Sequence, residues 1–416
     1  AIRFGPAFRH PCRSIRHCPL RGALVQPVGV MSITAPVQSS PPRQLLCCGD
    51  ATNLVTWSNT PYFLLQAGLK RGLFEGGLAL HPEQLQWQRR FWNLRQLLLS
   101  GKPGGFQYSQ SFTQALLAQA QLPADQPLEL LSHFPLLPAS PWPSAWRVAF
   151  YIDATTRQVL EDYGAGGRIT DAFQRDLLKR ERSAYQLATK VVCMCQWAAD
   201  SVVIDYGIDP AKVHVVPGGA NLDEAHLAKL PPASLPPPPS AAQPLRLGFL
   251  GKEWQRKGGP FLLELAEAQQ QRGVPTVVRA IGPDPAQLPP HSALQPLGFI
   301  NKQTDTARFV AELRSWHFGT LFSEAEAFGI SNRECLRLGV PVLAHAVGGI
   351  ASTLPDAGCG QLFPAQPSAV EVADWIHARL NPYEGYIAWR DALAPRWREF
   401  TWDAAVEQLA EILQSP

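Results

Sequence analysis

The stretch "LRLGFLGKEWQRKGGPFLLELAEA", residues 245–268, contains the three parts of one α/β unit. The apolar run at its start predicts a buried strand, which Gly251 ends. Gly258 and Gly259 free the backbone of a turn, and Pro260 suits the first turn of a helix. The stretch therefore predicts a strand, a glycine-containing turn and a helix in direct succession.

The same alternation of strand and helix patterns continues along the chain from residue 43. Further strands are expected at QLLCCG (44–49), LELLSHF (128–134), RVAFYI (147–152), KVVCMC (190–195), KVHVVP (212–217), TVVRAIG (276–282), WHFGTLF (316–322) and VPVLAHA (340–346). Between the two halves lies "LPPASLPPPPSAAQP", which is too rich in proline for a domain interior and predicts an extended linker. The fold class is therefore α/β, with two doubly wound Rossmann-like domains that have parallel sheets and face each other across a cleft.

These patterns predict five segments. They are an unstructured leader (1–42), an N-terminal Rossmann-like domain (43–229), the linker (230–244), a C-terminal Rossmann-like domain (245–380) and C-terminal helices that cross back to the N-terminal domain (381–416). Ligands of parallel sheets bind at the carboxyl ends of the strands, so the cleft is the expected site.

The leader accounts for the positive net charge of the 416-residue chain, which is +3. The first 49 residues hold six arginines and no acid, and without them the chain has 31 basic and 34 acidic residues. A nucleic-acid partner is therefore not expected. The leader could be a transit-type peptide or sequence upstream of a start at Met31. Pro6, Pro11 and Pro19 would break a targeting helix, which favours the second interpretation.

The cysteines and the hydropathy pattern indicate a cytoplasmic protein. No CxxC pair occurs, and Cys47, Cys48, Cys193 and Cys195 lie inside apolar runs, as small core residues of a reduced protein do. No apolar run approaches the roughly 20 residues that span a bilayer.

Three cations surround the turn of the opening stretch, namely Lys252, Arg256 and Lys257. A strand, a glycine turn, cations and a helix N-terminus together could cradle phosphates. The turn is not a Walker loop, because no Ser or Thr follows Lys252. Alone the pattern is weak, since a solvated basic turn is the commoner explanation.

A second turn, "EAFGISNRE" at 326–334, places Glu326 and Glu334 eight residues apart. In one continuous helix they would lie some 80° off a common face. A turn at Gly329 followed by a helix would instead put the two carboxylates on either side of a helix N-terminus, where anions bind. The alternative is a pair of unrelated surface carboxylates.

At these residues a family resemblance becomes visible. The segment "EAFGISNRECLRLGVPVLAHAVGG" (326–349), preceded by a Gly-x5-Lys-Gly-Gly loop, resembles the donor half of retaining glycosyltransferase family 4, which has the GT-B fold. The likeness spans roughly residues 43 to 413. It implies that 43–229 is the acceptor-side domain and that 245–380 is the nucleotide-sugar donor domain. It includes FYIDATTRQVLEDYG (150–164), AYQLATKVVCMCQWAADSVVIDYGIDPAKVHVVPGGANLD (184–223) and FTWDAAVEQLAEIL (400–413).

The resemblance implies roles for the residues at matching positions. Lys257, helped by Arg256 or Lys252, would neutralise the diphosphate of a nucleotide-sugar donor, with Gly258 in the same loop. Glu334 would bind the ribose hydroxyls. The transferred sugar would be held by Glu326 together with the backbone N–H groups of Phe328, Gly329 and Ile330. Asp153 lies where relatives place a His or Asp beside the anomeric carbon.

The chain departs from the family pattern at three places. Lys252 stands where many relatives have Arg, Cys195 where a Ser is usual, and Asp356 where a Glu is common. These differences leave the identity of the second cation and the role of Asp356 open.

The acceptor side is harder to assign. Trp57, Ser58 and Asn59 lie at the first strand–helix turn of the N-terminal domain, facing the cleft, and are the acceptor-side candidates. In the segment 84–105, arginines alternate with tryptophans and a phenylalanine, and no acid occurs. It could be an interfacial helix that touches anionic lipid. We expect the commoner alternative, a helix that packs its Trp and Leu side chains on the core.

The resemblance implies a cytoplasmic, retaining glycosyltransferase of the hexosyltransferase type, with a nucleoside-diphosphate sugar as donor, a glycan, lipid-linked or small-molecule acceptor and a possible peripheral contact with the inner membrane face. No DxD motif occurs, so neither a metal nor another cofactor is expected. Fixed cations and a helix N-terminus can stabilise a leaving diphosphate by themselves. The alternatives are a non-catalytic sugar-nucleotide-binding protein and a GT-B-like epimerase.

Overall fold

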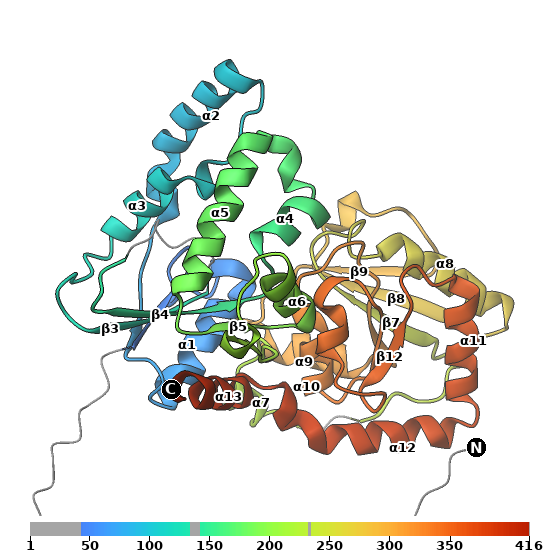
Figure 1. The fold of residues 1–416 in the computed structure, drawn as a ribbon. Coiled ribbons are helices and arrows are strands. Elements are labelled where there is room, and N and C mark those ends of the chain that lie inside the picture. Colours follow the sequence, from blue (N-terminus) through green and yellow to red (C-terminus); the bar gives the residue numbers. More distant parts are fainter. Residues whose placement is uncertain (1–42, 134–141, 232–233, 416) are drawn as a thin grey trace, which may run out of the picture. The chain divides into compact units, whose positions relative to one another are not determined.

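A computed structural model describes residues 43–133, 142–231 and 234–415 of the protein (Figure 1). These residues form two six-stranded sheets, in which all neighbouring strands are parallel. The predicted α/β class with two doubly wound parallel sheets is confirmed. The predicted leader, 1–42, lies outside the described residues.

The first sheet has the strand order β2-β1-β3-β4-β5-β6 and the second β12-β11-β10-β7-β8-β9. The strands of the first sheet are β1 (Arg43–Leu46), β2 (Gly76–Gly77), β3 (Leu128–Ser132), β4 (Trp146–Ile152), β5 (Val191–Cys193) and β6 (Val213–Val215). The strands of the second are β7 (Leu245–Leu250), β8 (Thr276–Ile281), β9 (Leu294–Gly298), β10 (Phe318–Leu321), β11 (Val342–His345) and β12 (Gly360–Phe363).

Helices follow most of these strands. Those of the first half are α1 (Thr60–Lys70), α2 (Gln86–Ser100), α3 (Gln110–Ala118), α4 (Thr156–Asp162), α5 (Asp171–Leu187), α6 (Gln196–Ile204) and α7 (Glu224–Leu227). Those of the second half are α8 (Gly259–Gln271), α9 (Thr306–Arg314), α10 (Ile330–Arg337), α11 (Ala369–Leu380), α12 (Tyr383–Leu393) and α13 (Trp402–Gln414).

The second sheet is buried on both faces, which is why β10 and β11 are buried at every residue rather than at alternate ones. One core packs β7 and β8 against α8 and α11. A second core packs the opposite face against α9 and α10.

Each sheet has one place where the chain order reverses. In the second sheet β8 and β9 follow on one side of β7, whereas β10, β11 and β12 follow on its other side. Thr320 of β10 pairs with Phe249 of β7, so the two strands end side by side. In the first sheet the reversal lies between β1 and β3. Such switch points are where doubly wound sheets bind ligands at the strands' carboxyl ends.

Three strands were not predicted, namely β2, β9 and β12, and all three are at sheet edges. β2 consists of two glycines, β9 contains Pro296, and β12 is a four-residue strand that begins with Gly360. Edge strands pair on one side only, so they need neither a long apolar run nor an unbroken row of amide donors.

The expectation that the segment 84–105 packs its Trp and Leu side chains on the core holds only in part. Leu85 and Trp92 pack in a small core with Phe106 and Phe112. The helix in this segment is α2, and none of its residues is fully buried. The pattern alone could not settle this point, because an amphipathic helix presents the same spacing to a core and to a membrane.

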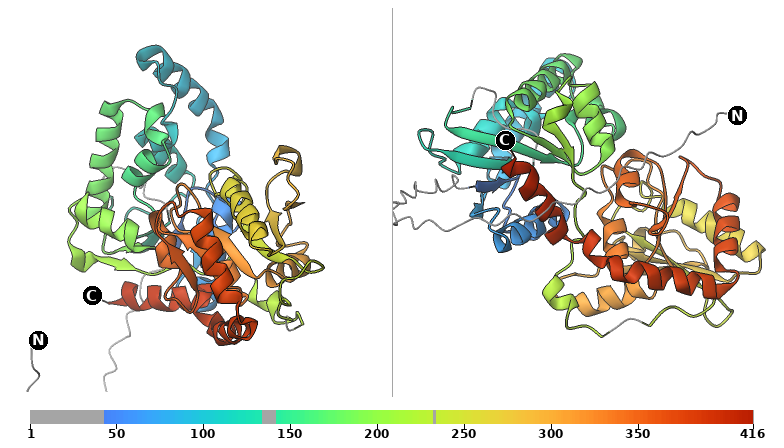
Figure 2. Two further views of the ribbon diagram at one scale, coloured as in Figure 1. Left: turned by 90° about the vertical axis from the view of Figure 1, so that its right-hand side faces the viewer. Right: turned by 60° about the horizontal axis from the view of Figure 1, so that its bottom comes forward.

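The last helix, α13, packs on the first half of the chain. In Figures 1 and 2 it lies beside α1, and Lys70 Nζ is 2.6 Å from Asp403 Oδ2. Val406 and Leu409 belong to the core of the first sheet. In the proline-rich segment, residues 230–231 and 234–244 contain no helix or strand. The domain boundaries themselves stay a prediction.

Candidate active site

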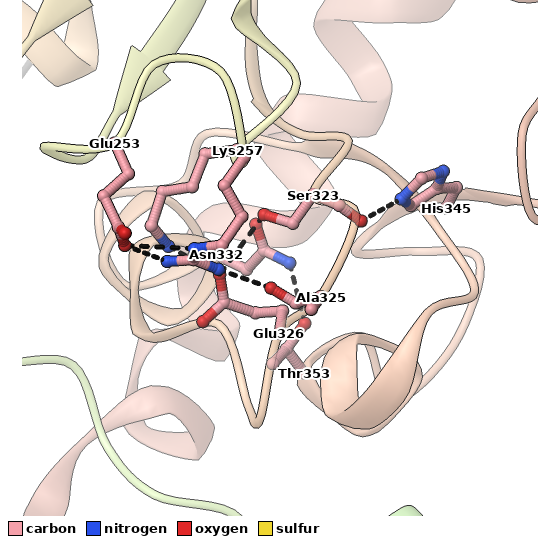
Figure 3. A network of polar contacts seen from close by, with 9 residues as sticks. Glu253, Lys257, Ser323, Ala325, Glu326, Asn332, His345 and Thr353 are labelled. Atoms are coloured by element: carbon pink, nitrogen blue, oxygen red, sulfur yellow. Dashed lines mark hydrogen bonds and ion pairs between the residues drawn. The ribbon is translucent and has the colours of Figure 1, made fainter. Parts of the chain in front are cut away.

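The loops that follow β7 and β10 meet at the switch point of the second sheet. Lys257 Nζ lies 2.5 Å from Glu326 Oε2, which also accepts a hydrogen bond from Ser323 Oγ at 3.2 Å. Arg256 Nη1 is 3.7 Å from the same carboxylate oxygen and donates to the carbonyl of Ala325. Figure 3 shows the side chains of Lys257, Ser323 and Glu326 pointing toward one another from the two loops. The cations and the acid are therefore one cluster.

Two glycines allow the loops to approach so closely. A Cβ on Gly258, which has φ +80°, would lie 2.3 Å from the carbonyl oxygen of Phe322. A Cβ on Gly251 would lie 2.4 Å from Cδ of Lys257 itself. Any larger residue at either position would displace the side chain that carries the charge.

The helix N-terminus expected after "EAFG" is present, because α10 begins at Ile330. Gly329 caps it in the left-handed region, with φ +98°. Within residues 43–133, 142–231 and 234–415, the backbone N–H groups of Phe328, Gly329 and Ile330 have no hydrogen-bond partner. These three donors and the positive end of the helix dipole are available to an anion.

Glu334 lies one turn further along α10 and does not touch Glu326. Its side chain is only 2% exposed, and Lys302, from the loop before α9, donates to it. Burial raises the pKa of Glu334, while the charge of Lys302 opposes the rise. Lys302 was missed in the sequence, because it is 32 residues away and belongs to no motif.

The structure separates the two cations proposed as helpers of Lys257. Arg256 lies at the cluster and is fixed by Glu253, with 3.0 Å between its Nε and the carboxylate. Lys252 is exposed, and its Nζ lies 5.9 Å from the centre of the Phe299 ring. Arg256 is therefore the better-placed second cation.

Asp153 follows β4 and comes toward the same cluster. Asp153 is accessible to water, but many protein atoms lie around its carboxyl group, as at the bottom of a depression. This crowding raises its pKa, with the charge of Glu326 acting in the same direction and that of His133 against it. Burial lowers the pKa of His133, whose Nδ1 donates to Tyr151 O at 2.7 Å. The sequence analysis missed His133, although its position just past β3 was a usable signal.

Cys195 and Tyr163 connect the first half of the chain to the Glu326 loop. The thiol of Cys195 donates to the carbonyls of Asp153 and Ala327, at 3.4 and 3.3 Å, and it caps α6. Cysteine thus does the capping expected of a serine at this position. The ring of Tyr163 lies 5.5 Å from the guanidinium of Arg256. Tyr163 lay inside a quoted motif, but its spacing did not single it out.

The acceptor-side candidates occupy an unusual turn after β1. Trp57, Ser58 and Asn59 are all left-handed, with φ of 43°, 57° and 77°. Consecutive left-handed L-residues are costly, and such strain is found preferentially at functional sites. The amide of Asn221 donates to the carbonyl of Ser58 at 2.8 Å, and its side-chain oxygen accepts from Trp402. The turn is therefore held by the chain from two sides, near the switch point of the first sheet.

Asp356 has a structural partner. It forms two hydrogen bonds of 2.9 Å with Arg396, which lower its pKa. No group of three or more His, Cys, Asp or Glu side chains that could hold a metal ion occurs among the described residues. In the same part of the chain, the helices are all too short or too polar to span a bilayer.

Comparison with known proteins places these residues in context. No family model matches the chain. D-inositol 3-phosphate glycosyltransferase of Salinispora arenicola is 29% identical over 257 residues, 54% of each chain. The enzyme of the same name from Streptomyces coelicolor is 30% identical over 248 residues, 51% of this chain and 52% of that one. The match thus spans about half the length of these curated relatives.

Solved structures share the fold over most of the chain. Sucrose-phosphate synthase from Thermosynechococcus elongatus has a TM-score of 0.57 at 14% identity, covering 90% of this chain and 98% of that one. HepE of Anabaena, in complex with UDP and glucose, has the same score and identity and covers 90% and 100%. The two parallel sheets and these neighbours agree with a GT-B fold. The curated relatives that this chain resembles are named glycosyltransferases.

Proposed function

Because the chain is related to GT4-type glycosyltransferases and has the GT-B fold, we propose that it is a retaining, metal-independent glycosyltransferase that uses a nucleoside-diphosphate sugar. The observation that carries this proposal is the cluster of Lys257, Arg256 and Glu326 beside the N-terminus of α10. It lies at the switch point of the second sheet, where such folds bind their ligands. A glycan, a lipid-linked molecule or a small molecule is the acceptor.

The cations would act on the leaving group. When the bond between the sugar and the diphosphate breaks, negative charge grows on the diphosphate. Lys257, Arg256 and the free amides at the start of α10 are already fixed near one another, so little reorganisation is needed as the charge develops. A divalent metal would do the same work in other enzymes, and these groups supply its charge here.

Binding of the donor would exchange the partners of Lys257. In the structure Lys257 pairs with Glu326. A diphosphate in its place would free one carboxylate oxygen of Glu326 for the sugar hydroxyls. Glu334, which is buried and forms an ion pair with Lys302, would accept hydrogen bonds from the ribose.

Asp153 would act on the other charge of the reaction. As the sugar–phosphate bond breaks, positive charge develops on the anomeric carbon, and an ionised carboxylate beside it stabilises that charge. Asp153 is suited to this role because its carboxylate is open to water and lies close enough to Glu326 to feel its charge.

The test is turnover of a panel of nucleotide sugars, measured as release of the nucleoside diphosphate with and without acceptors and with a chelator. UDP-glucose leads the panel because the HepE structure contains UDP and glucose, and D-inositol 3-phosphate is included among the acceptors because it appears in the relatives' name. Release that needs an acceptor and survives the chelator supports the proposal, and the anomeric configuration of the product tests retention. Conversion of the donor without any acceptor would indicate an epimerase. Binding without any reaction would indicate a binding protein.

We propose that the reaction takes place in the cytoplasm, where the enzyme would take its soluble nucleotide-sugar donor. A peripheral position at the inner membrane face is compatible with a lipid-linked acceptor.

A further inference from the structure

Helix α2 carries a concentration of exposed apolar side chains that no other helix of the described chain matches. Fourteen large hydrophobic residues are exposed in the described residues, and six of them lie on this helix. They are Trp87, Phe91, Leu94, Leu97, Leu98 and Leu99. Single exposed apolar residues are ordinary, but a contiguous patch marks a surface that binds something.

Four of these residues form one stripe. Trp87, Phe91, Leu94 and Leu98 are spaced by four, three and four residues, which places them within an arc of roughly 60° on the helix. Their exposed fractions are 76%, 71%, 55% and 78%. The stripe therefore points outward along nearly the whole of α2, which extends past its neighbours in Figure 1 and in the left view of Figure 2.

The opposite side of α2 holds the helix in place. Trp92 donates from Nε1 to Gly104 O at 3.0 Å, and its ring packs against Phe106 and Phe173, each at 6.1 Å between ring centres. A groove of about 530 Å³, lined in part by Trp87, Phe91 and Trp92, adjoins the stripe. The apolar surface offered to a partner is thus larger than the stripe alone.

The charges around the stripe are all of one sign. Arg90 and Arg95 lie on its two sides, each roughly 40° from its edge at 100° per residue. Both are exposed, and neither forms an ion pair with any described residue. The guanidinium of Arg90 lies 4.8 Å from the centre of the Trp87 ring. Between Glu83 and Asp125 the sequence contains no acid.

This charge pattern selects one occupant. A second copy of the chain pairing α2 with α2 would bring arginines against arginines, with no acid on either helix. Residues 1–42 contain five arginines and no acid. Charge therefore does not favour this segment as the partner that binds over the stripe either. A helix with Trp, Phe and Leu on one face and arginines along its borders is instead suited to the headgroup region of an anionic bilayer.

We propose that the outward face of α2 docks on an anionic lipid surface, with the stripe inserted among the headgroups and acyl chains and with Arg90 and Arg95 on lipid phosphates. The inference goes beyond the proposed function, and its test needs no turnover. It would place the acceptor side of the protein next to a membrane.

The test is co-sedimentation of the full chain with vesicles of phosphatidylcholine alone and of phosphatidylcholine mixed with phosphatidylglycerol. We expect binding to the mixed vesicles that weakens with added salt, and much weaker binding to the neutral ones. The double variant Phe91→Ser/Leu98→Ser should lose binding. Arg90→Gln and Arg95→Gln should each weaken it about fivefold, since one basic residue at an anionic surface contributes about 1 kcal/mol.

Two matched variants serve as controls. Ile204→Ser removes an apolar side chain that is 77% exposed on α6, and binding should not change. Arg89→Gln removes a charge from α2 on the side away from the stripe, and it should cost less than either flanking arginine. All the substituted side chains are exposed or nearly so, and thermal melts should therefore match the parent protein.

Three results would overturn the proposal. They are equal binding of the parent protein to neutral and anionic vesicles, undiminished binding by Phe91→Ser/Leu98→Ser, and no binding to either vesicle. A fourth such result would come from light scattering in the absence of vesicles. A dimer of the parent protein that dissociates in the Phe91→Ser/Leu98→Ser variant would show that the stripe binds a second copy of the chain.

Discussion

Lys257 and Glu326 form an ion pair, with 2.5 Å between Nζ and Oε2, that joins the loops after β7 and β10. Both side chains are largely buried, with 16% and 13% of their surface exposed. In the proposed function Lys257 neutralises the leaving diphosphate, so this pair is the contact on which the proposed chemistry depends.

Lys257→Ala should reduce turnover at saturating donor by about 10²–10³, because the diphosphate gains charge in the transition state. Lys257→Arg should not restore it, since a planar fork does not replace a point charge at a fixed distance. Lys252→Ala is the comparison within the same turn, and its exposed position predicts a smaller loss. Near-normal turnover in a Lys257→Ala protein with an unchanged thermal melt would contradict the phosphate-binding role.

Glu334→Ala should raise the KM for the donor more than it lowers kcat. Contacts to the ribose are similar in the bound donor and in the transition state, and such uniform binding affects KM alone. Steady-state kinetics with varied donor measure both constants. A collapse of kcat at an unchanged donor KM would show that Glu334 acts in the chemical step instead.

Lys302→Ala should make donor binding depend on pH. Without the positive charge of Lys302, the already raised pKa of Glu334 rises further. The carboxyl then stays protonated up to a higher pH, and in that form it binds the ribose poorly. Donor affinity should improve as pH rises through that pKa. A group with a raised folded-state pKa binds protons more tightly in the folded protein, so stability should fall over the same pH range. Donor titrations and melts across pH measure the two effects. Affinity independent of pH in this variant would refute the assignment.

The acid limb of the pH profile of kcat should lie at a higher pH than protonation of an ordinary aspartate would produce. Surrounding protein and the charge of Glu326 raise the pKa of Asp153, and only its ionised form stabilises a positive anomeric carbon. The limb should move to still higher pH in His133→Gln, because His133 opposes the rise. A pH profile of kcat for both proteins is the measurement. A limb that stays in place, or moves the other way, would exclude Asp153 as its origin.

Gly258→Ala should destabilise the protein and lower turnover together. The position has φ +80°, and the added Cβ would lie 2.3 Å from Phe322 O, so the loop that carries Lys257 must move. Gly273→Ala is the matched control at the other end of α8, with φ +75° and no atom near the added Cβ. It should cost only the left-handed backbone strain of about 1–2 kcal/mol and leave turnover intact. Equal effects of the two substitutions on turnover would mean that the close contact between the loops after β7 and β10 is not needed for turnover.

Local sequence patterns sufficed for much of the fold. Buried strands of parallel sheets are apolar runs, and glycine and proline mark their ends, so the interior strands and the helix after Gly329 were predictable. The edge strands β2, β9 and β12 were not, because a strand that pairs on one side carries little apolar signal. The spacing of Glu326 and Glu334 predicted that they lie on either side of a helix N-terminus, as they do at α10. Only the family resemblance associated Lys257, which lies in another turn, with them.

Only the tertiary structure decided which side chains meet. Lys252 and Arg256 lie in one turn and look equivalent in the sequence, yet one faces Phe299 and the other Glu326. Lys302 reaches Glu334 from 32 residues away, and no local pattern encodes such a pairing. The same holds for the apolar stripe of α2. Its period predicts an amphipathic helix, but which of its faces is covered depends on the elements that the fold brings beside it.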